Sequence, residues 1–324
     1  MAYVLENRSV TVAVIIPCYK VEGFIREVLA SLPAMVDFII PVDDCSPDAT
    51  GRLLDEAAQG DARIRVIHHS QNQGVGGSMR SGFREALRLS ADVAVKLDGD
   101  GQMDVRYLEK MVAMLASSPA YDFVKGNRFH DRGRIGDMPV IRRIGNMGMS
   151  FLIKMASGYW NISDPANGYF AIRTSTLAQL PLERLSPRFF FESSLIIELY
   201  YTGAKIKDLA MPAIYGQEKS NLSVCKTLLT FPWKLQKAFL RRILLRYFIC
   251  DFNISSVYIL TGLPLFLFGA VFGLCKWIHY AGLHTPTPTG TIMISVLSIV
   301  LGFQMLLASI QYDITAGNPF EKEE

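Results

Sequence analysis

Residues 95–102 read VKLDGDGQ, an apolar stretch that ends on two aspartates separated by one residue. Three kinds of structure use such a pair. An EF-hand calcium loop also begins D-x-D, but its sixth position must be glycine, where this chain has Met103, and a helix must precede it. A plain turn before a helix that Asp104 caps is the second interpretation. The third is a site for Mg²⁺ or Mn²⁺ with a nucleotide diphosphate, since these cations combine one or two carboxylates with water and phosphate oxygens.

The elements that must position this pair alternate along the first half of the chain. Nearly continuous apolar stretches predict strands, and amphipathic stretches between them predict helices. Strands are expected at residues 10–17, 35–44, 62–69 and 92–98, and helices at residues 23–31, 48–58, 78–90 and 105–115. This alternation is typical of a parallel sheet covered on both faces, in an α/β fold. Ligands of such sheets bind beyond the carboxyl ends of the strands, where the chain places Pro17, Tyr19, Asp43, Asp44, Asp98 and Asp100.

Composition narrows the class of protein. Half of the residues are apolar and the net charge is only +3, which excludes a disordered chain and a strongly basic nucleic-acid binder. We therefore expect no nucleic-acid partner and an association with a membrane. The five cysteines form no C-x-x-C pair, as is typical of reduced thiols in a cytosolic compartment.

The stretch NQGVGGSMRSG precedes the third predicted helix. It lacks the full G-x-G-x-x-G pattern after the first strand, which disfavours dinucleotide binding. Two interpretations stay open: the glycines ease a tight passage from strand to helix, or they line a sugar-nucleotide pocket.

Six segments together carry a resemblance to a known family: IIPCYKVEGFI, VDDCSPDATG, NQGVGGSMRSGF, LDGDGQMD, KGNRF and DPANGYFAIR. In order and approximate spacing they resemble the inverting family-two glycosyltransferases of GT-A fold. The chain is most similar to the polyprenyl-phosphate branch, which includes the dolichol-phosphate mannose synthases. The resemblance covers roughly residues 10–222.

The resemblance implies roles for individual residues. Pro17, Tyr19, Val42 and Asp44 would hold the base and ribose of a UDP- or GDP-linked sugar, and Asp98 and Asp100 would bind the metal, with Gly99 and Gln102 beside them. Arg128 and Lys219 would face the diphosphate or an acceptor phosphate. Where many relatives carry a glutamate after a tyrosine-asparagine pair, this chain reads Tyr19-Lys20-Val21-Glu22, which leaves one polar contact open.

Two further motifs keep two interpretations each. Asp164, Asn167 and Gly168 either line the acceptor side, as the resemblance implies, or only form a turn. Glu192 either contacts the donor sugar or favours the start of the helix predicted near residues 188–203.

The C-terminal third changes character. A basic amphipathic stretch begins at Cys225, with its cations within about half of a helical wheel: Lys234, Lys237, Arg241, Arg242 and Arg246. This pattern is typical of a helix on an anionic membrane surface. Two uncharged runs follow, each long enough to cross a bilayer. We predict a GT-A domain (1–224), an amphipathic interfacial helix (225–250), a transmembrane helix (251–280), an extracytoplasmic turn (281–290), a second transmembrane helix (291–313) and a cytoplasmic tail (314–324).

The sequence thus predicts a glycosyltransferase anchored by a two-helix transmembrane hairpin in the cytoplasmic (inner) membrane, with its catalytic domain in the cytoplasm. Its acceptor would be a polyprenyl phosphate of the undecaprenyl or dolichyl type. Two alternatives stay open: transfer to a hydroxyl of a lipid-linked saccharide or other glycan, and a non-catalytic membrane scaffold with a nucleotide-binding fold. Donor base and sugar, the choice between Mg²⁺ and Mn²⁺, and a homo-oligomeric state are left open.

Overall fold

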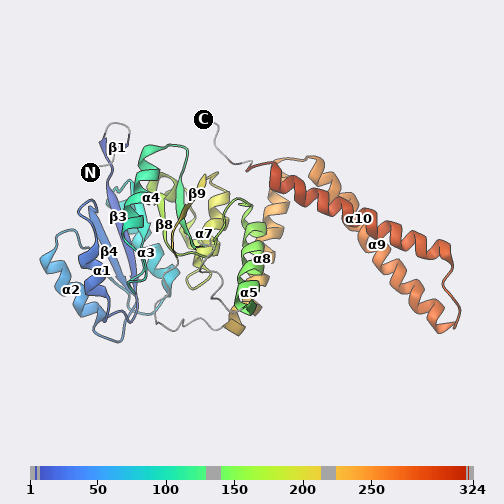
Figure 1. Cartoon of the computed structure of the whole chain (residues 1–324), viewed down its shortest axis with the longest axis horizontal. Coiled ribbons are helices and arrows are strands. Elements are labelled where there is room, and N and C mark those ends of the chain that lie inside the picture. The colour runs from blue at the N-terminus through green and yellow to red at the C-terminus, as the bar shows by residue number, and fades with distance from the viewer. Residues whose placement is uncertain (1–3, 6–7, 129–139, 213–223, 319, 321–324) are drawn as a thin grey trace. The chain divides into compact units, whose positions relative to one another are not determined.

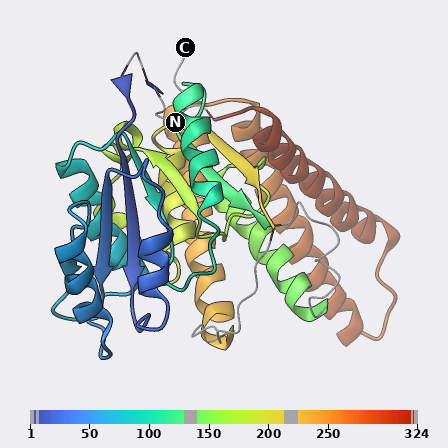
Figure 2. The ribbon, with the colours of Figure 1, turned by 60° about the vertical axis from the view of Figure 1, so that its left-hand side comes forward.

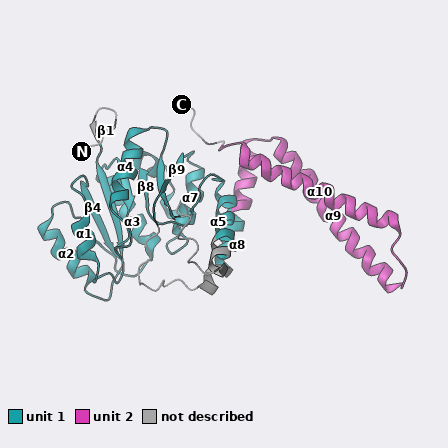
Figure 3. Cartoon of the chain, in the orientation of Figure 1, with its two compact units in different colours: residues 1–238, 320–324 teal, residues 239–319 magenta. Residues whose placement is uncertain are grey.

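The chain forms two compact units in a computed structural model, residues 1–238 with 320–324 and residues 239–319 (Figure 3). The structure describes residues 4–5, 8–128, 140–212, 224–318 and 320. The first unit holds a sheet flanked by helices, and the second holds the end of a long helix and two apolar helices. The finer domain boundaries expected from the sequence stay predictions.

The first unit is built from short strands and helices that alternate along the chain (Figure 1). Its strands are β1 (Val4–Leu5), β2 (Arg8–Ser9), β3 (Val12–Cys18), β4 (Phe38–Asp43), β5 (Ile67–His68), β6 (Val93–Lys96), β7 (Phe123–Asn127), β8 (Phe170–Arg173) and β9 (Ile206–Ala210). Its helices are α1 (Ile25–Ser31), α2 (Thr50–Gly60), α3 (Val75–Arg88), α4 (Arg106–Ser117), α5 (Val140–Ser157), α6 (Thr174–Leu177), the 3-10 turn η3 (Leu182–Arg184) and α7 (Phe191–Tyr200).

The main sheet has seven strands in the order β5-β4-β3-β6-β8-β7-β9. β3 pairs in parallel with β4 and β6, and β7 pairs in parallel with β9. β8 is antiparallel to both of its neighbours, β6 and β7, so within this described sheet it runs against the other strands. The predicted α/β fold with a mostly parallel sheet is therefore confirmed, while the third expected strand shrinks to the two residues of β5.

Helices cover both faces of this sheet (Figures 1 and 2). Because successive side chains of a strand point to opposite faces, β3 sends Val12, Val14 and Ile16 into one apolar cluster and Ala13 and Ile15 into another. The first cluster contains the buried faces of α1 and α4, and the second contains those of α3 and α7. Because helices cover both faces of the sheet, polar groups can contact a ligand at the ends of the strands.

Two long apolar helices dominate the second unit. α8 (Val224–Leu244) crosses the boundary between the units and continues as a π-helical turn, η4 (Leu245–Cys250). α9 (Ile254–Gly282) and α10 (Thr289–Thr315) are each long and apolar enough to cross a membrane. These helices support membrane anchoring and confirm the expected two-helix hairpin.

Small residues let α9 and α10 approach each other closely. A Cβ added at Gly262 would lie 2.8 Å from Met305 Cβ, and one at Gly302 would lie 2.5 Å from the backbone nitrogen of Phe266. Ser295 Oγ donates a hydrogen bond to the carbonyl oxygen of Gly269 at 2.8 Å. In lipid, the hydrophobic effect does not drive helices together. Helix–helix association there depends on close backbone packing and interhelical hydrogen bonds of this kind.

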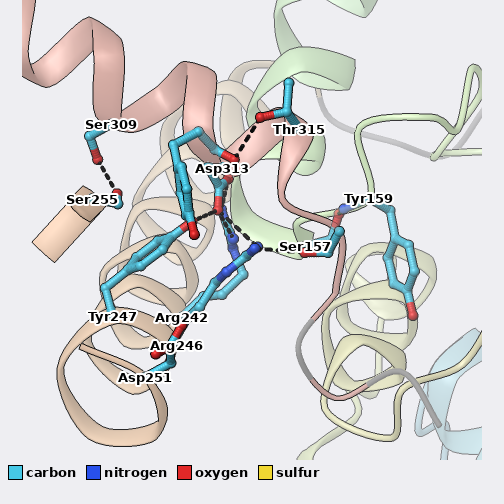
Figure 4. Close-up of polar contacts among 12 residues, drawn as sticks. Ser157, Tyr159, Arg242, Arg246, Tyr247, Asp251, Ser255, Ser309, Asp313 and Thr315 are labelled. Atoms are coloured by element: carbon cyan, nitrogen blue, oxygen red, sulfur yellow. Dashed lines mark hydrogen bonds and ion pairs between the residues drawn. The ribbon is translucent and has the colours of Figure 1, made fainter. Parts of the chain in front are cut away.

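A buried charge cluster joins the end of α8 and the π-turn to the last turn of α10 (Figure 4). Arg242 donates to both carboxylate oxygens of Asp313 at 2.8 Å, and Arg246 and Tyr247 donate to Oδ1 at 3.1 and 2.6 Å. Arg246 also donates to the carbonyl oxygen of Gly317 at 2.6 Å. Burial, with the Asp313 carboxylate beside it, raises the pKa of the Tyr247 phenol, which therefore remains a hydrogen-bond donor.

This cluster corrects the amphipathic pattern expected for residues 225–250. Arg242 and Arg246 are almost fully buried, so they do not share an outward face with Lys234 and Lys237, which are exposed. The physical reason is Asp313, the acidic partner that a buried guanidinium needs. The helical wheel of a single segment could not reveal that partner.

Replacing Asp313 with alanine would leave two buried guanidinium groups without their shared carboxylate. We expect Asp313→Ala to reduce the free energy of unfolding by about 3–5 kcal/mol. Thermal unfolding of the full chain in detergent measures the loss. Asp251→Ala is the matched control, since Asp251 is exposed and accepts a local hydrogen bond from Asn253, and its effect should stay within about 0.5 kcal/mol. Equal shifts for the two variants would contradict the cluster's role.

Candidate active site

The carboxyl ends of β3, β4 and β6 lie side by side because β3 pairs in parallel with the other two. Pro17 stands opposite Val42 and Cys18 opposite Asp43 in the β3–β4 register. Tyr19, just past β3, is exposed, whereas Val42 has no exposed surface and supports the strand end from inside the core. The predicted nucleotide contacts of these residues stay predictions, with Tyr19 the one most open to a ligand.

Asp44 is buried and holds the loop that leads into α3. Its Oδ1 accepts hydrogen bonds from the backbone nitrogen of Gln73 and from His69 Nδ1, at 2.8 and 2.7 Å, and its Oδ2 accepts one from the nitrogen of Gly74 at 2.7 Å. His69 Nε2 lies 2.9 Å from Ser81 Oγ, which ties the same network to α3. Asp44 therefore organises the wall of the site, whatever contact it makes with a nucleotide.

The glycines before and within α3 permit close approach of the backbone. Gly74 has φ +82°, a conformation that favours glycine. A Cβ at Gly76 would lie 1.9 Å from the carbonyl oxygen of Ser186, and one at Gly82 would lie 2.2 Å from Ile15 Cγ2. Of the two interpretations of this stretch, the structure supports the tight strand-to-helix passage.

Residues 19–22, where the chain departs from the first motif of the family, make local contacts that explain their identity. Lys20 adopts φ +57°, and its ammonium lies 5.5 Å from the centre of the Tyr19 ring. Two residues further, Glu22 Oε2 accepts a hydrogen bond from the backbone nitrogen of Ala49 at 2.9 Å, at the start of α2. Glu22 thus helps to begin a helix.

The D-x-D loop follows β6 directly. Asp98 and Asp100 are partly exposed, and the side chain of Asp98 is 34% exposed. Asp100 Oδ1 accepts a hydrogen bond from the backbone nitrogen of Gln102 at 3.0 Å, and Gly101 takes φ +73° to turn the chain. Gly99 is buried, and a Cβ added there would lie 3.4 Å from Val21 Cγ2 and 3.5 Å from Cys18 Sγ. The loop therefore presents carboxylates at the strand end, as expected.

A buried lysine lies beneath this loop. Lys96 Nζ donates to Asp98 Oδ1 at 2.6 Å and lies 3.5 Å from Glu192 Oε1, at the start of α7. Burial lowers the pKa of Lys96, but the carboxylates of Asp98 and Glu192 outweigh that effect and raise it overall. Lys96 is therefore an ammonium group shared between two carboxylates.

A second charge cluster lies where β7 ends. Arg128 Nε and Nη2 donate to the two oxygens of the buried Asp164 at 2.8 and 3.2 Å, and Lys125 Nζ donates to the Asp164 carbonyl oxygen. Burial lowers the pKa of Lys125 to about 8, although the charges of Asp164 and Asp208 oppose the shift. The Arg128 side chain is 40% exposed, so it is an oriented cation at the surface of the site.

The turn at Asp164–Gly168 satisfies its own backbone. Asn167 Nδ2 donates to the Gly126 carbonyl oxygen at 2.8 Å, and Asn167 Oδ1 accepts from the nitrogen of Tyr169 at 3.0 Å. The backbone nitrogen of Asn167 also donates to the Asp164 carbonyl oxygen at 3.2 Å. Turn chemistry accounts for Asn167.

The structure brings most of the predicted residues together at one edge of the sheet, and Lys219 lies outside the described residues. Sequence reasoning missed Lys96 and His69. Lys96 had a signal: it is the charged residue within the apolar strand VAVKL, and a buried charge needs a partner. The described residues contain no group of three or more His, Cys, Asp or Glu side chains that could hold a metal ion.

Known proteins of similar sequence share the expected chemistry. A UDP-N-acetylglucosamine–dolichyl-phosphate N-acetylglucosaminyltransferase of Methanococcus voltae is 29% identical over 216 residues, 63% of this chain and 85% of that protein. An undecaprenyl-phosphate mannosyltransferase of Micrococcus luteus is 30% identical over 150 residues, 46% of this chain and 60% of that protein. These names support the resemblance to the polyprenyl-phosphate branch.

A solved structure and a family model complete the comparison. The crystal structure of a mycobacterial protein, 18% identical, superposes with a TM-score of 0.50 over 72% of this chain and 74% of that one, and it supports the fold alone. The model of glycosyl transferase family 2 matches residues 13–180, more than half of the chain. With the strand ends and carboxylates arranged as described, this protein belongs to glycosyl transferase family 2.

Proposed function

We propose that this glycosyltransferase moves a sugar from a UDP- or GDP-linked donor to a polyprenyl phosphate at the cytoplasmic face of a membrane. An in-line displacement at the anomeric carbon would invert its configuration. The names of the two relatives support this acceptor class, because one name includes dolichyl phosphate and the other includes undecaprenyl phosphate. The residues below account for how such a transfer would proceed.

The observation that carries the proposal is the ion pair between Glu192 and Lys96. A sugar hydroxyl is a poor nucleophile that needs a general base, and Glu192 is a partly buried carboxylate beside the D-x-D loop. Glu192 Oε1 lies 3.5 Å from the buried ammonium of Lys96, so this carboxylate already serves as the counter-charge of a buried cation. A phosphate monoester is already anionic, with a second pKa near ~6, and needs no base. The site therefore suits a phosphate acceptor better than a hydroxyl.

The D-x-D residues fit a divalent cation. Mg²⁺ and Mn²⁺ prefer hard oxygen ligands, and Asp98 is 34% exposed at the strand end with only its Oδ1 bonded to Lys96. Asp98 and Asp100 would hold Mg²⁺ or Mn²⁺ together with oxygens of the donor diphosphate. The cation would offset the charge that develops on the leaving diphosphate.

Cations of the chain would manage the remaining negative charge. Arg128 is oriented by its two hydrogen bonds to Asp164, so its guanidinium is preorganised for the diphosphate or the acceptor phosphate. Lys219, which lies outside the described residues, would act mainly on the lipid phosphate. Placing one anion beside another is the main task of this site, and preorganised cations reduce their repulsion.

The C-terminal helices would keep the active site at the lipid surface. Along α8 the exposed apolar side chains of Trp233, Leu240 and Leu244 recur at helical spacing, with the exposed Lys237 among them. Apolar side chains with interspersed cations suit an anionic membrane surface. Cations concentrated before α9 would keep both termini in the cytoplasm of a two-span protein in the cytoplasmic (inner) membrane.

The first experiment supplies the purified chain with a panel of UDP- and GDP-sugars and polyprenyl phosphate, and identifies the product by mass spectrometry. We expect a glycosyl-phosphoryl-polyprenol, abolished by EDTA and reduced about 10²-fold or more by Asp100→Asn. Asp104→Asn is the matched control, because Asp104 pairs with Arg106 at the start of α4 and should be dispensable for turnover. Absence of this product with every donor of the panel would overturn the proposed acceptor, and full activity in EDTA would overturn the role of the metal.

The second experiment tests Glu192 directly. We expect Glu192→Gln to lower turnover without changing the shape of the pH–rate profile, because Glu192 partners Lys96 and takes no proton from the acceptor. NMR of the product should show an inverted anomeric configuration. If the variant loses the limb in which rate rises with pH, Glu192 is a base and a hydroxyl acceptor is favoured.

The third experiment tests topology through Thr287, in the connection between α9 and α10. In a background whose native cysteines are replaced by alanine, Thr287→Cys should react with an impermeant maleimide only from the side opposite the catalytic domain. A cysteine at residue 2 is the control and should react only from the cytoplasmic side. Cytoplasmic labelling of residue 287 would rule out two crossings. The native cysteines are Cys18, Cys45, Cys225, Cys250 and Cys275.

A further inference from the structure

Lys96 is in direct contact with one of the two aspartates assigned to the metal. The Lys96 side chain is 1% exposed, and its ammonium donates to Asp98 Oδ1 at 2.6 Å. Glu192 Oε1 lies 3.5 Å from the same nitrogen. The lysine therefore lies beneath the carboxylates, shielded from solvent.

The absence of a side chain at Gly168 leaves room for the ammonium of Lys96. A Cβ at Gly168 would lie 2.6 Å from Lys96 Nζ, 3.4 Å from Glu192 Oε1 and 3.6 Å from Asp98 Oδ2. The strand end of β6, the turn before β8 and the first turn of α7 therefore meet around one ammonium group. The hydrogen bonds of the turn did not explain the glycine at position 168. The close approach of Lys96 Nζ explains it.

The lysine changes what the D-x-D loop offers to a cation. Its positive charge offsets part of the negative charge of Asp98, Asp100 and Glu192, and it occupies one oxygen of Asp98. Within the described part of the chain, no third His, Cys, Asp or Glu joins the pair in a metal-binding group. Without a nucleotide, a divalent cation at this loop would have few protein ligands and would be repelled by the nearby ammonium.

We propose that Lys96 keeps the D-x-D loop a weak site for a divalent cation until the donor diphosphate arrives, so that cation and donor bind together. This inference rests on the metal-assisted donor binding of the proposed function. Diphosphate oxygens would supply the missing ligands and the negative charge that the ammonium offsets. Lys96 is then a positioning residue that couples the two ligands through Asp98.

The test measures Mn²⁺ binding by electron paramagnetic resonance on the full chain in detergent, without nucleotide and with UDP or GDP. Wild type should bind Mn²⁺ weakly alone and at least about tenfold more tightly with a nucleoside diphosphate. Lys96→Met, which is similar in volume but uncharged, should bind Mn²⁺ alone at least about tenfold more tightly than wild type. The gain from adding nucleotide should shrink correspondingly.

Two variants separate charge from other effects. Lys125→Met removes another buried lysine, whose hydrogen bond goes to the Asp164 carbonyl, and should leave the Mn²⁺ affinity measured without nucleotide unchanged. Lys96→Gln keeps a hydrogen-bond donor for Asp98 but not the charge, and it should behave as Lys96→Met does. It also serves as the test if methionine fails to fold.

Each outcome decides between the proposals. If wild type binds Mn²⁺ with nucleotide and neither Lys96 variant tightens binding without it, this inference is overturned and the proposed function stands. Lys96→Gln resembling wild type while Lys96→Met binds tightly would overturn the role of charge. Absence of Mn²⁺ binding by wild type, even with UDP and GDP, would overturn the metal step and this inference together.

Discussion

The buried ammonium of Lys96 is the constraint on which the arrangement of the site depends. A charge enclosed by a sheet and helices is tolerated only beside opposite charge, and Asp98 and Glu192 supply it. Those carboxylates come from different segments, the loop after β6 and the first turn of α7. The ion pairs of one lysine therefore fix the relative position of the D-x-D loop and a helix that are far apart in sequence.

The same principle recurs in two other clusters. Asp164 is buried against Arg128 and Lys125, and joins the end of β7 to the turn before β8. In the second unit Asp313 joins the last turn of α10 to Arg242 and Arg246. Each cluster joins segments that are far apart in the sequence. Buried pairs of this kind contribute specificity of arrangement more than net stability.

Periodicity accounts for the part of the fold that the sequence could predict. The apolar runs and the amphipathic stretches between them predicted β3, β4 and β6, the helices between these strands and the hairpin. A strand buried on both faces, like a helix suited to lipid, has a continuous apolar sequence. Periodicity could not give the direction of β8, since strand pairing is a tertiary property, or the shortness of β5. The burial of Arg242 was not predicted, and Lys96 was not identified as a site residue. The reason is the same for both: their partners, Asp313 and Glu192, are distant in sequence.

A glycosyltransferase whose acceptor is an anion faces a different problem from one whose acceptor is a hydroxyl. The nucleophile needs no base, but it must approach a diphosphate that repels it. The described site answers with cations that are oriented by buried carboxylates: Lys96 by Asp98 and Glu192, and Arg128 by Asp164. Carboxylates used in this way fix the position of positive charge in the site. Under the proposed function, the pairing of Glu192 with Lys96 thus connects the packing of the fold to the anionic class of the acceptor.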